Sequence, residues 1–121
     1  VGEIVPTQDF YSYDAKYINA DGAKLRIPAE IDEAVAEEIR QYAMKAFKTT
    51  CCEGMARVDF FLTKENRLVL NELNTLPGFT EISMYPKLWE ASGISYKDLI
   101  TELITLSLLR DNRDSELLTE G

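Results

Sequence analysis

Two neighbouring stretches with the pattern of β-strands constrain the fold of this chain more than any other feature of its sequence. In residues 56–61 and 71–80, β-branched and aromatic residues alternate with charged or polar ones. The residues between them at 63–66, Thr-Lys-Glu-Asn, have the composition of a turn. Together these stretches predict an antiparallel β-hairpin.

The length of the hairpin loop decides which side chains meet. Residues two apart in a strand share a face, so Arg57 and Asp59 point together, and so do Glu72 and Asn74. A four-residue loop places both pairs on one face, whereas a three- or five-residue loop would separate them. With the four-residue loop, one face gathers two carboxylates, a carboxamide and a guanidinium.

This group of side chains suits a magnesium ion. Neighbouring carboxylates repel each other unless a cation lies between them. Magnesium takes one or two carboxylates and fills its octahedron with water and phosphate oxygens. Asp59, Glu72 and Asn74 are therefore candidate metal ligands, and Arg57 would meet an anion that the metal brings. The alternative is a hairpin with a solvated face whose charges serve solubility alone.

Length and composition indicate one globular unit and argue against some classes of partner. The 121 residues are 45% hydrophobic, which is ordinary for a globular protein. The 21 acidic and 13 basic residues give a formal net charge of -8, which argues against binding to nucleic acid. The sequence contains no apolar run long enough for a membrane span and no signal peptide.

Cysteine and histidine usage narrows the chemistry. Cys51 and Cys52 are adjacent, so they are expected to be free thiols in a reducing cytoplasm. The absence of histidine excludes Ser-His-Asp and Cys-His catalysis. The chain begins Val-Gly-Glu-Ile-Val-Pro without an initiator methionine, so we expect a fragment of a longer enzyme.

The remaining elements are predicted from apolar periodicity and end signals. Asp32 is the expected N-cap of the helix at 30–47. Ser95 and Asp98 form a variant of the capping box at the start of the helix at 95–109. The wide apolar face of that last helix would serve the core or interdomain packing. In chain order we expect a strand at 3–5 ended by Pro6, a long loop at 7–24, a helix at 30–47, a helix from near Ser83 to Gly93, a helix at 95–109 and a frayed tail at 110–121.

Two segments are candidate binding loops. The long loop at 7–24 carries four aromatic rings and is a candidate lid, or else a surface loop held by those rings. The Pro77-Gly78 turn allows a close backbone approach to a ligand, unless it is an ordinary strand-to-helix turn. A helix that starts at Ser83 presents unpaired N–H groups, so Ser83 and the Met84 amide can hold a carboxylate; Ser83 as a simple helix cap is compatible with that.

The order of these motifs resembles the signature of the ATP-grasp ligases, and most closely that of the D-alanine-D-alanine ligases. Arg-x-Asp at 57–59 is followed by a turn and by Glu-x-Asn-Thr-x-Pro-Gly-x-Thr at 72–80. Similar blocks are Phe-Tyr-Ser-Tyr-Asp-Ala-Lys-Tyr at 10–17 and Ser-Met-Tyr-Pro at 83–86. The resemblance covers roughly residues 2–108.

The resemblance implies an α+β fold and a reaction. Residues 1–109 would form the C-terminal part of an ATP-grasp domain, with an antiparallel sheet packed with helices on one side, and residues 110–121 a polar tail. The reaction converts two D-alanine molecules and ATP into D-alanyl-D-alanine, ADP and phosphate through an acyl phosphate. It is a cytoplasmic step of peptidoglycan precursor synthesis for the cell wall. In the family the adenine pocket lies mostly upstream of Val1, so the isolated chain is expected to be inactive.

The resemblance also implies roles for residues of the hairpin and the turn. Asp59 and Glu72 would hold one Mg²⁺ ion, and Glu72 and Asn74 a second, with Mn²⁺ as an alternative. The two ions would neutralise the β- and γ-phosphates of ATP, the co-substrate. Arg57 and the Gly78 amide would stabilise the oxygen of the tetrahedral intermediate.

Residues outside the hairpin would contact the substrates. Lys16 in the long loop would reach the transferring phosphate, and Tyr17 would bond to groups of an upstream domain. Ser83 and Met84 would bind the carboxylate of the second D-alanine. The implied partners are ATP, D-alanine and the missing N-terminal and central domains of the same enzyme, with room for a homodimer of the full enzyme.

Two other functions remain open from the residues alone. One is an ATP-grasp carboxylate-amine ligase with a different acceptor. The other is a non-catalytic acidic module that binds divalent cations. Arg57 separates the second alternative from a ligase, because a cation store gains nothing from a guanidinium beside its carboxylates.

Overall fold

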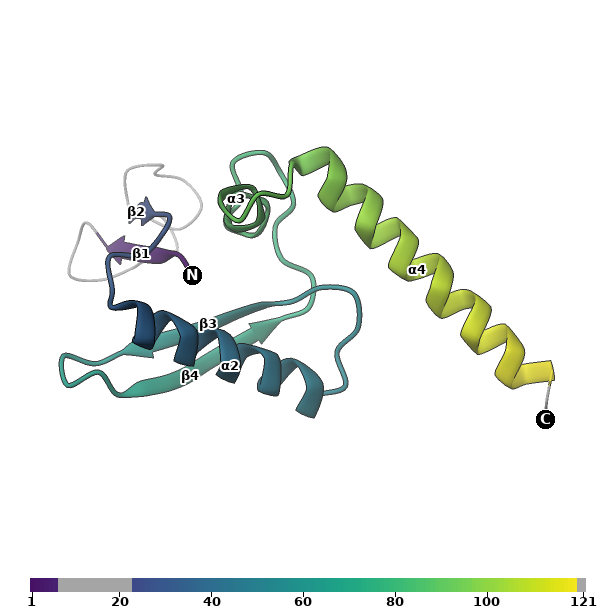
Figure 1. Cartoon of the computed structure of the whole chain (residues 1–121), viewed down its shortest axis with the longest axis horizontal. Coiled ribbons are helices and arrows are strands. Elements are labelled where there is room, and N and C mark those ends of the chain that lie inside the picture. The colour runs from purple at the N-terminus through teal and green to yellow at the C-terminus, as the bar shows by residue number, and fades with distance from the viewer. Residues whose placement is uncertain (7–22, 120–121) are drawn as a thin grey trace.

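The computed structural model describes residues 1–6 and 23–119 (Figure 1). Strands and helices both occur, and the strands pair antiparallel, so the predicted α+β class with antiparallel pairing is confirmed. The elements in chain order are β1 (Glu3–Pro6), β2 (Ala23–Arg26), α2 (Glu33–Thr49), β3 (Arg57–Leu62), β4 (Leu68–Asn74), α3 (Met84–Ala91) and α4 (Tyr96–Thr119).

In the described residues, the strands form two separate two-stranded sheets, β1–β2 and β3–β4. The expected loop at 7–24 ends earlier than predicted, because Ala23 and Lys24 already belong to β2 and pair with Pro6 and Val5. The sequence of β2, Ala-Lys-Leu-Arg, is too short and too weakly patterned to predict a strand without knowledge of its partner strand. The rest of that loop, with its candidate lid, lies outside the described residues.

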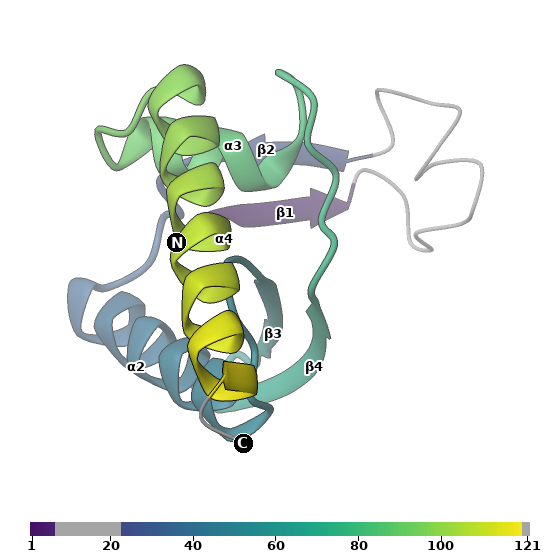
Figure 2. The ribbon, with the colours of Figure 1, turned by 90° about the vertical axis from the view of Figure 1, so that its right-hand side faces the viewer.

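The β1–β2 sheet lies next to α3 (Figure 2). A Cβ atom added to Gly2 would lie 2.7 Å from side-chain atoms of both Met84 and Leu88, so a larger residue would require the ends of these two flexible side chains to shift. The start of β1 is therefore packed directly on the helix that follows the Pro77-Gly78 turn.

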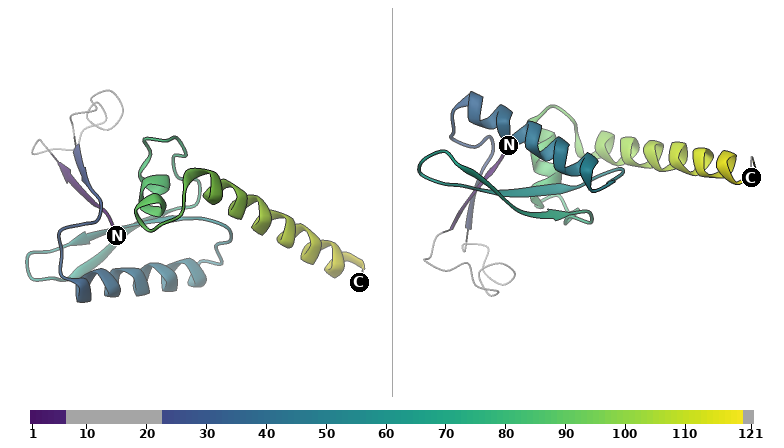
Figure 3. Two further views of the ribbon diagram at one scale, coloured as in Figure 1. Left: turned by 45° about the horizontal axis from the view of Figure 1, so that its top comes forward. Right: turned by 90° about the horizontal axis from the view of Figure 1, so that it is seen from below.

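Helix α2 lies along the β3–β4 hairpin, as Figure 3 shows from two sides. It was predicted at 30–47 and is found at Glu33–Thr49, with Asp32 in the N-cap position and Glu33 in the first turn. Asp32 makes no side-chain capping bond, and its carbonyl accepts the Ala36 N–H at 2.9 Å. Ala36 in this helix is one of the few buried apolar residues of the described part of the chain, with 7% of its surface exposed.

Helix α4 begins as predicted and continues beyond its predicted end. The Ser95 hydroxyl accepts the Asp98 N–H at 3.1 Å and donates to the Asp98 carboxylate at 2.8 Å, which confirms the capping interaction. The helix was expected to stop at 109 and to be followed by a frayed tail, and both expectations are wrong, because it runs to Thr119. The division of the chain into a domain at 1–109 and a tail at 110–121 stays a prediction.

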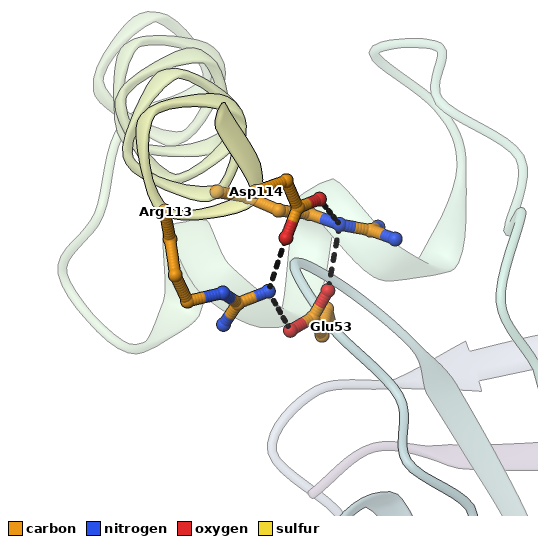
Figure 4. A network of polar contacts seen from close by, with 4 residues as sticks. Glu53, Arg113 and Asp114 are labelled. Atoms are coloured by element: carbon orange, nitrogen blue, oxygen red, sulfur yellow. Dashed lines mark hydrogen bonds and ion pairs between the residues drawn. The ribbon is translucent and has the colours of Figure 1, made fainter. Parts of the chain in front are cut away.

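Ion pairs with the α2–β3 connection accompany the extra helical turns of α4 (Figure 4). Arg110 Nε forms an ion pair with Glu53 Oε2 at 2.8 Å, and Arg113 Nη2 donates a hydrogen bond to Glu53 Oε1 at 2.8 Å. The bond to Glu53 also raises the pKa of the Arg113 guanidinium. Arg110 and Arg113 are one helical turn apart, so both reach the same carboxylate only while this segment is helical.

Most of the apolar face of α4 is exposed. Leu99 is 4% exposed and packs in the core, but Ile104, Leu108 and Leu109 are each more than half exposed. Elsewhere in the described residues, Leu76 is 80% exposed and Ile82 is 78% exposed, so apolar surface is also left uncovered outside this helix. No described helix is both long enough and apolar enough to cross a membrane.

Candidate functional site

The four polar residues of the hairpin share one face, as predicted. Arg57 is the Cα partner of Asn74, and Asp59 is the partner of Glu72. Directly opposed residues of an antiparallel pair project to the same side, so the two carboxylates face each other across the ladder. Val58 projects to the opposite side, because successive side chains alternate.

The loop that closes this hairpin differs from the prediction. The last pair of the ladder is Leu62 with Leu68, so residues 63–67 form an odd-numbered connection. Within it, the Thr63 N–H donates to the Arg67 carbonyl at 3.0 Å, and Asn66 adopts a left-handed φ of 58°. The predicted four-residue loop is therefore wrong, and a regular ladder built on this loop would separate the two polar pairs.

A β-bulge restores the shared face. The ladder pairs Phe60 with Leu70 and Asp59 with Glu72, so Asn71 is an extra residue in β4 without a partner in the register. The additional residue shifts everything after it by one position, which returns Glu72 to the face of Asp59. The prediction of the face was correct because the odd loop and the bulge compensate for each other.

Arg57 forms ion pairs with both carboxylates of this face. Its Nε and Nη2 atoms donate to the two carboxylate oxygens of Asp59 at 2.9 and 3.0 Å, and Nη2 lies 3.7 Å from Glu72 Oε1. The side chains of Arg57 and Asp59 are 21% and 25% exposed, whereas that of Glu72 is 51% exposed. The guanidinium offsets the repulsion between the carboxylates, and Glu72 faces outward for a ligand.

The side chains of this face form an incomplete set of metal ligands. No group of three or more His, Cys, Asp or Glu side chains among residues 1–6 and 23–119 is arranged to hold a metal by itself. Asp59 and Glu72 supply two carboxylates, and each carboxylate oxygen keeps a further lone pair. Asn74 Oδ1 accepts the Leu76 N–H at 3.0 Å and keeps a second lone pair. Such a partial set matches magnesium, which takes its remaining ligands from water and phosphates.

The turn after β4 brings Gly78, Thr80 and Ser83 together. A Cβ atom on Gly78 would lie 3.1 Å from Ser83 Oγ, so the hydroxyl sits over the glycine backbone. Ser83 Oγ accepts the Thr80 N–H at 3.0 Å and lies 2.8 Å from Thr80 Oγ1. Ser83 occupies the N-cap position of α3 but makes no side-chain capping bond. Its hydroxyl therefore bonds within the turn, and Ser83 caps α3 by its position and backbone but not through its side chain.

An aromatic cluster fixes this turn to both C-terminal helices. The Phe79 ring lies 5.8 Å from the ring of Tyr85 and 5.6 Å from that of Tyr96, measured between centroids. The Tyr96 hydroxyl also donates to the Phe79 carbonyl at 2.9 Å. Burial raises the pKa of Tyr85, so its phenol stays neutral. Helix α3 then starts at Met84, whose amide belongs to the free N-terminal end of the helix.

The structure does not test every predicted site residue. Lys16 and Tyr17 lie outside the described residues. The sequence interpretation gave no role to three residues that position the site: Asn71 at the bulge, Thr80 beside Ser83, and Tyr96, which bonds to the Phe79 carbonyl. The sequence contained a weak signal for the role of Thr80, because its hydroxyl lies three residues before that of Ser83, which is a spacing typical of local side-chain bonds in turns.

The model of the D-ala D-ala ligase C-terminus family matches residues 1–105. The chain belongs to this family. The D-alanine--D-alanine ligase of Oceanobacillus iheyensis is 60% identical over 116 residues, which are 96% of this chain and 32% of the relative. Members of the D-ala D-ala ligase family in the curated set are thus about three times as long as the matched region.

Solved structures give the same assignment. The D-alanine-D-alanine ligase from Coxiella burnetii superposes with a TM-score of 0.78 at 46% identity, over 80% of this chain and 28% of that one. The D-alanine--D-alanine ligase from Bacillus anthracis, solved in complex with ATP, gives a TM-score of 0.68 at 29% identity, over 74% of this chain and 31% of that one. These superpositions confirm the predicted ATP-grasp fold, which is the fold of the D-ala D-ala ligase family.

Proposed function

We propose that this chain is the part of an ATP-dependent D-alanine-D-alanine ligase that holds the metal and the acceptor. The complete enzyme would make D-alanyl-D-alanine in the cytoplasm for peptidoglycan synthesis. The observation that carries the proposal is the pair of opposed carboxylates with a guanidinium between them, in a chain of this family. A guanidinium at this position favours a phosphate or oxyanion site over a cation store.

The acidic face of the hairpin would bind the metal ions of the ATP complex. Asp59 and Glu72 would hold one ion, and Glu72 and Asn74 the second. Magnesium, or manganese in its place, would supply positive charge to the β- and γ-phosphates. Asp59 has a second task, because its bidentate bond fixes the orientation of Arg57.

Arg57 and Gly78 would act in the second half of the reaction. The neutral amine of the acceptor attacks the carbonyl carbon of the D-alanyl phosphate, a C–N bond forms while the carbonyl oxygen becomes an oxyanion, and the nitrogen loses one proton to water. The C–O bond to phosphate then breaks, and phosphate leaves with the electron pair. A fixed guanidinium and a backbone N–H stabilise the oxyanion without reorganising.

The remaining roles concern the substrates. Ser83 and the Met84 amide would bind the acceptor carboxylate at the start of α3, where the helix dipole favours an anion. Lys16 would contact the transferring phosphate, and Tyr17 an upstream domain; both roles rest on the resemblance alone.

The test is the Glu72→Gln variant of the full-length ligase that carries this chain. Glu72 is half exposed, so we expect the melting temperature to change little. Turnover should fall by about 100-fold or more, because a charge shared by two ions is lost. ADP release is measured across a magnesium titration, with Glu65→Gln, at the exposed loop of the same hairpin, as the matched control.

Near-normal turnover of Glu72→Gln at limiting magnesium would refute the metal role. Magnesium binding by the wild-type protein with no ADP release in the presence of D-alanine and ATP would instead support a non-catalytic cation-binding module.

A further inference from the structure

The hydroxyl groups of Thr80 and Ser83 form a pair whose proton arrangement matters for function. Their oxygens are 2.8 Å apart, and either can be the donor. Ser83 Oγ also accepts the Thr80 N–H at 3.0 Å. A serine hydroxyl has one proton and two acceptor lone pairs, so these contacts use most of its bonding capacity.

Two proton arrangements are compatible with this geometry. In the first, Ser83 donates to Thr80 Oγ1, and its only proton is then used inside the turn. In the second, Thr80 donates to Ser83 Oγ, which fills both acceptor positions of Ser83 and leaves its proton free to point out of the turn. A carboxylate accepts hydrogen bonds and donates none, so it selects the second arrangement.

We infer that Thr80 is a positioning residue that directs the Ser83 proton toward the carboxylate of the acceptor D-alanine. This inference rests on the proposed function, in which Ser83 binds that carboxylate. Thr80 itself does not touch the substrate. When the acceptor carboxylate selects the second arrangement, the two bonds from Thr80 fill both acceptor positions of Ser83 Oγ and hold its proton toward the ligand.

The surrounding turn keeps the pair in place. The Ser83 N–H donates to the Thr80 carbonyl at 2.9 Å, so backbone and side-chain bonds join the same two residues. On one side the Gly78 backbone limits the movement of Ser83 Oγ. On the other, the bond from Tyr96 anchors the preceding Phe79 carbonyl. Ser83 is only partly buried, so a ligand can reach its hydroxyl.

The test uses Thr80→Val and Thr80→Ser in the full-length ligase. Valine keeps the shape of threonine and removes the hydroxyl donor, whereas serine keeps the donor. With ATP and D-alanine as substrates, Thr80→Val should raise the KM of the acceptor site by about tenfold, the value of one hydrogen bond to a charged group. We expect kcat, the KM for ATP and the melting temperature to stay close to wild type, and Thr80→Ser to restore the acceptor KM.

A double-mutant cycle with Ser83→Ala distinguishes a failure of the Thr80 inference from a failure of the proposed acceptor site. If Thr80 acts through Ser83, Thr80→Val should change the acceptor KM less than twofold in the Ser83→Ala background. An equal effect in both backgrounds would overturn the inference, and so would an unchanged KM in the single variant Thr80→Val. An unaltered acceptor KM in Ser83→Ala would overturn both this inference and the acceptor site of the proposed function. Should Thr80→Val not fold, Thr80→Ala replaces it in the same cycle with the same expected outcomes.

Discussion

Replacing Arg57 with lysine isolates the contribution of its bidentate geometry from that of its charge. In the structure, two nitrogens of Arg57 bond to both oxygens of Asp59, at 2.9 and 3.0 Å, and Nη2 also lies 3.7 Å from Glu72. Lysine keeps the positive charge but has a single ammonium group, which cannot donate two parallel bonds to one carboxylate. The variant therefore loses about one charge-assisted hydrogen bond and the fixed orientation of the cation.

The size of the effect follows from that count. A hydrogen bond to a charged group contributes about 1.5–3 kcal/mol, which corresponds to roughly a 10- to 150-fold change. Because the bond orients the cation toward the reacting groups, we expect most of the loss in kcat of the full-length ligase. Stability should fall by less than the full amount, since lysine still pairs with one oxygen of Asp59.

The assay is ADP release at saturating D-alanine and magnesium, with the melting temperature measured in parallel. Arg67→Lys is the control, because it makes the same chemical change at the exposed loop of the same hairpin. A kcat of Arg57→Lys within about twofold of wild type, together with an unchanged Arg67→Lys, would show that bidentate geometry is irrelevant and refute the reasoning.

Two further predictions concern the turn and the whole chain. Gly78→Ala places a Cβ 3.1 Å from Ser83 Oγ, so the serine must shift and the acceptor KM should rise severalfold. A wild-type KM would show that the hydroxyl position is not important. The isolated 121-residue chain should release no ADP above a no-protein control in the presence of ATP, magnesium and D-alanine, because positioning supplies much of the catalysis and only part of the ligase is present. Turnover that Asp59→Asn abolishes would contradict this prediction.

The sequence was sufficient to predict where α2 lies and where α3 and α4 begin, because these features follow from apolar periodicity and end signals. Apolar spacing located α2, and the Ser95–Asp98 pair located the start of α4. The bulge at Asn71 could not be predicted, because a single extra residue changes the register without changing the alternation on either side of it. The face was therefore predicted correctly from an incorrect loop length.

Long-range contacts account for the other differences. The segment after Leu109 has a polar sequence, and its helix contacts Glu53, which lies some sixty residues earlier. Likewise the bond from Tyr96 to the Phe79 carbonyl joins residues that no local pattern connects. Ser83 had the correct position for a helix cap, but the competing hydroxyl and N–H of Thr80 decided the direction of its side chain.

The bulge separates the closure of the hairpin from the placement of its charged residues, which is useful for protein engineering. The opposition of Asp59 and Glu72 is set where the ladder passes from the Phe60–Leu70 pair to the next one, several residues before the loop. Any connection that keeps Leu62 beside Leu68 can therefore replace residues 63–67, whether it is longer, shorter or a fused peptide. A slip of β4 by one residue has the opposite result. It would place Asn71 opposite Asp59 and send the second carboxylate to the other face of the hairpin.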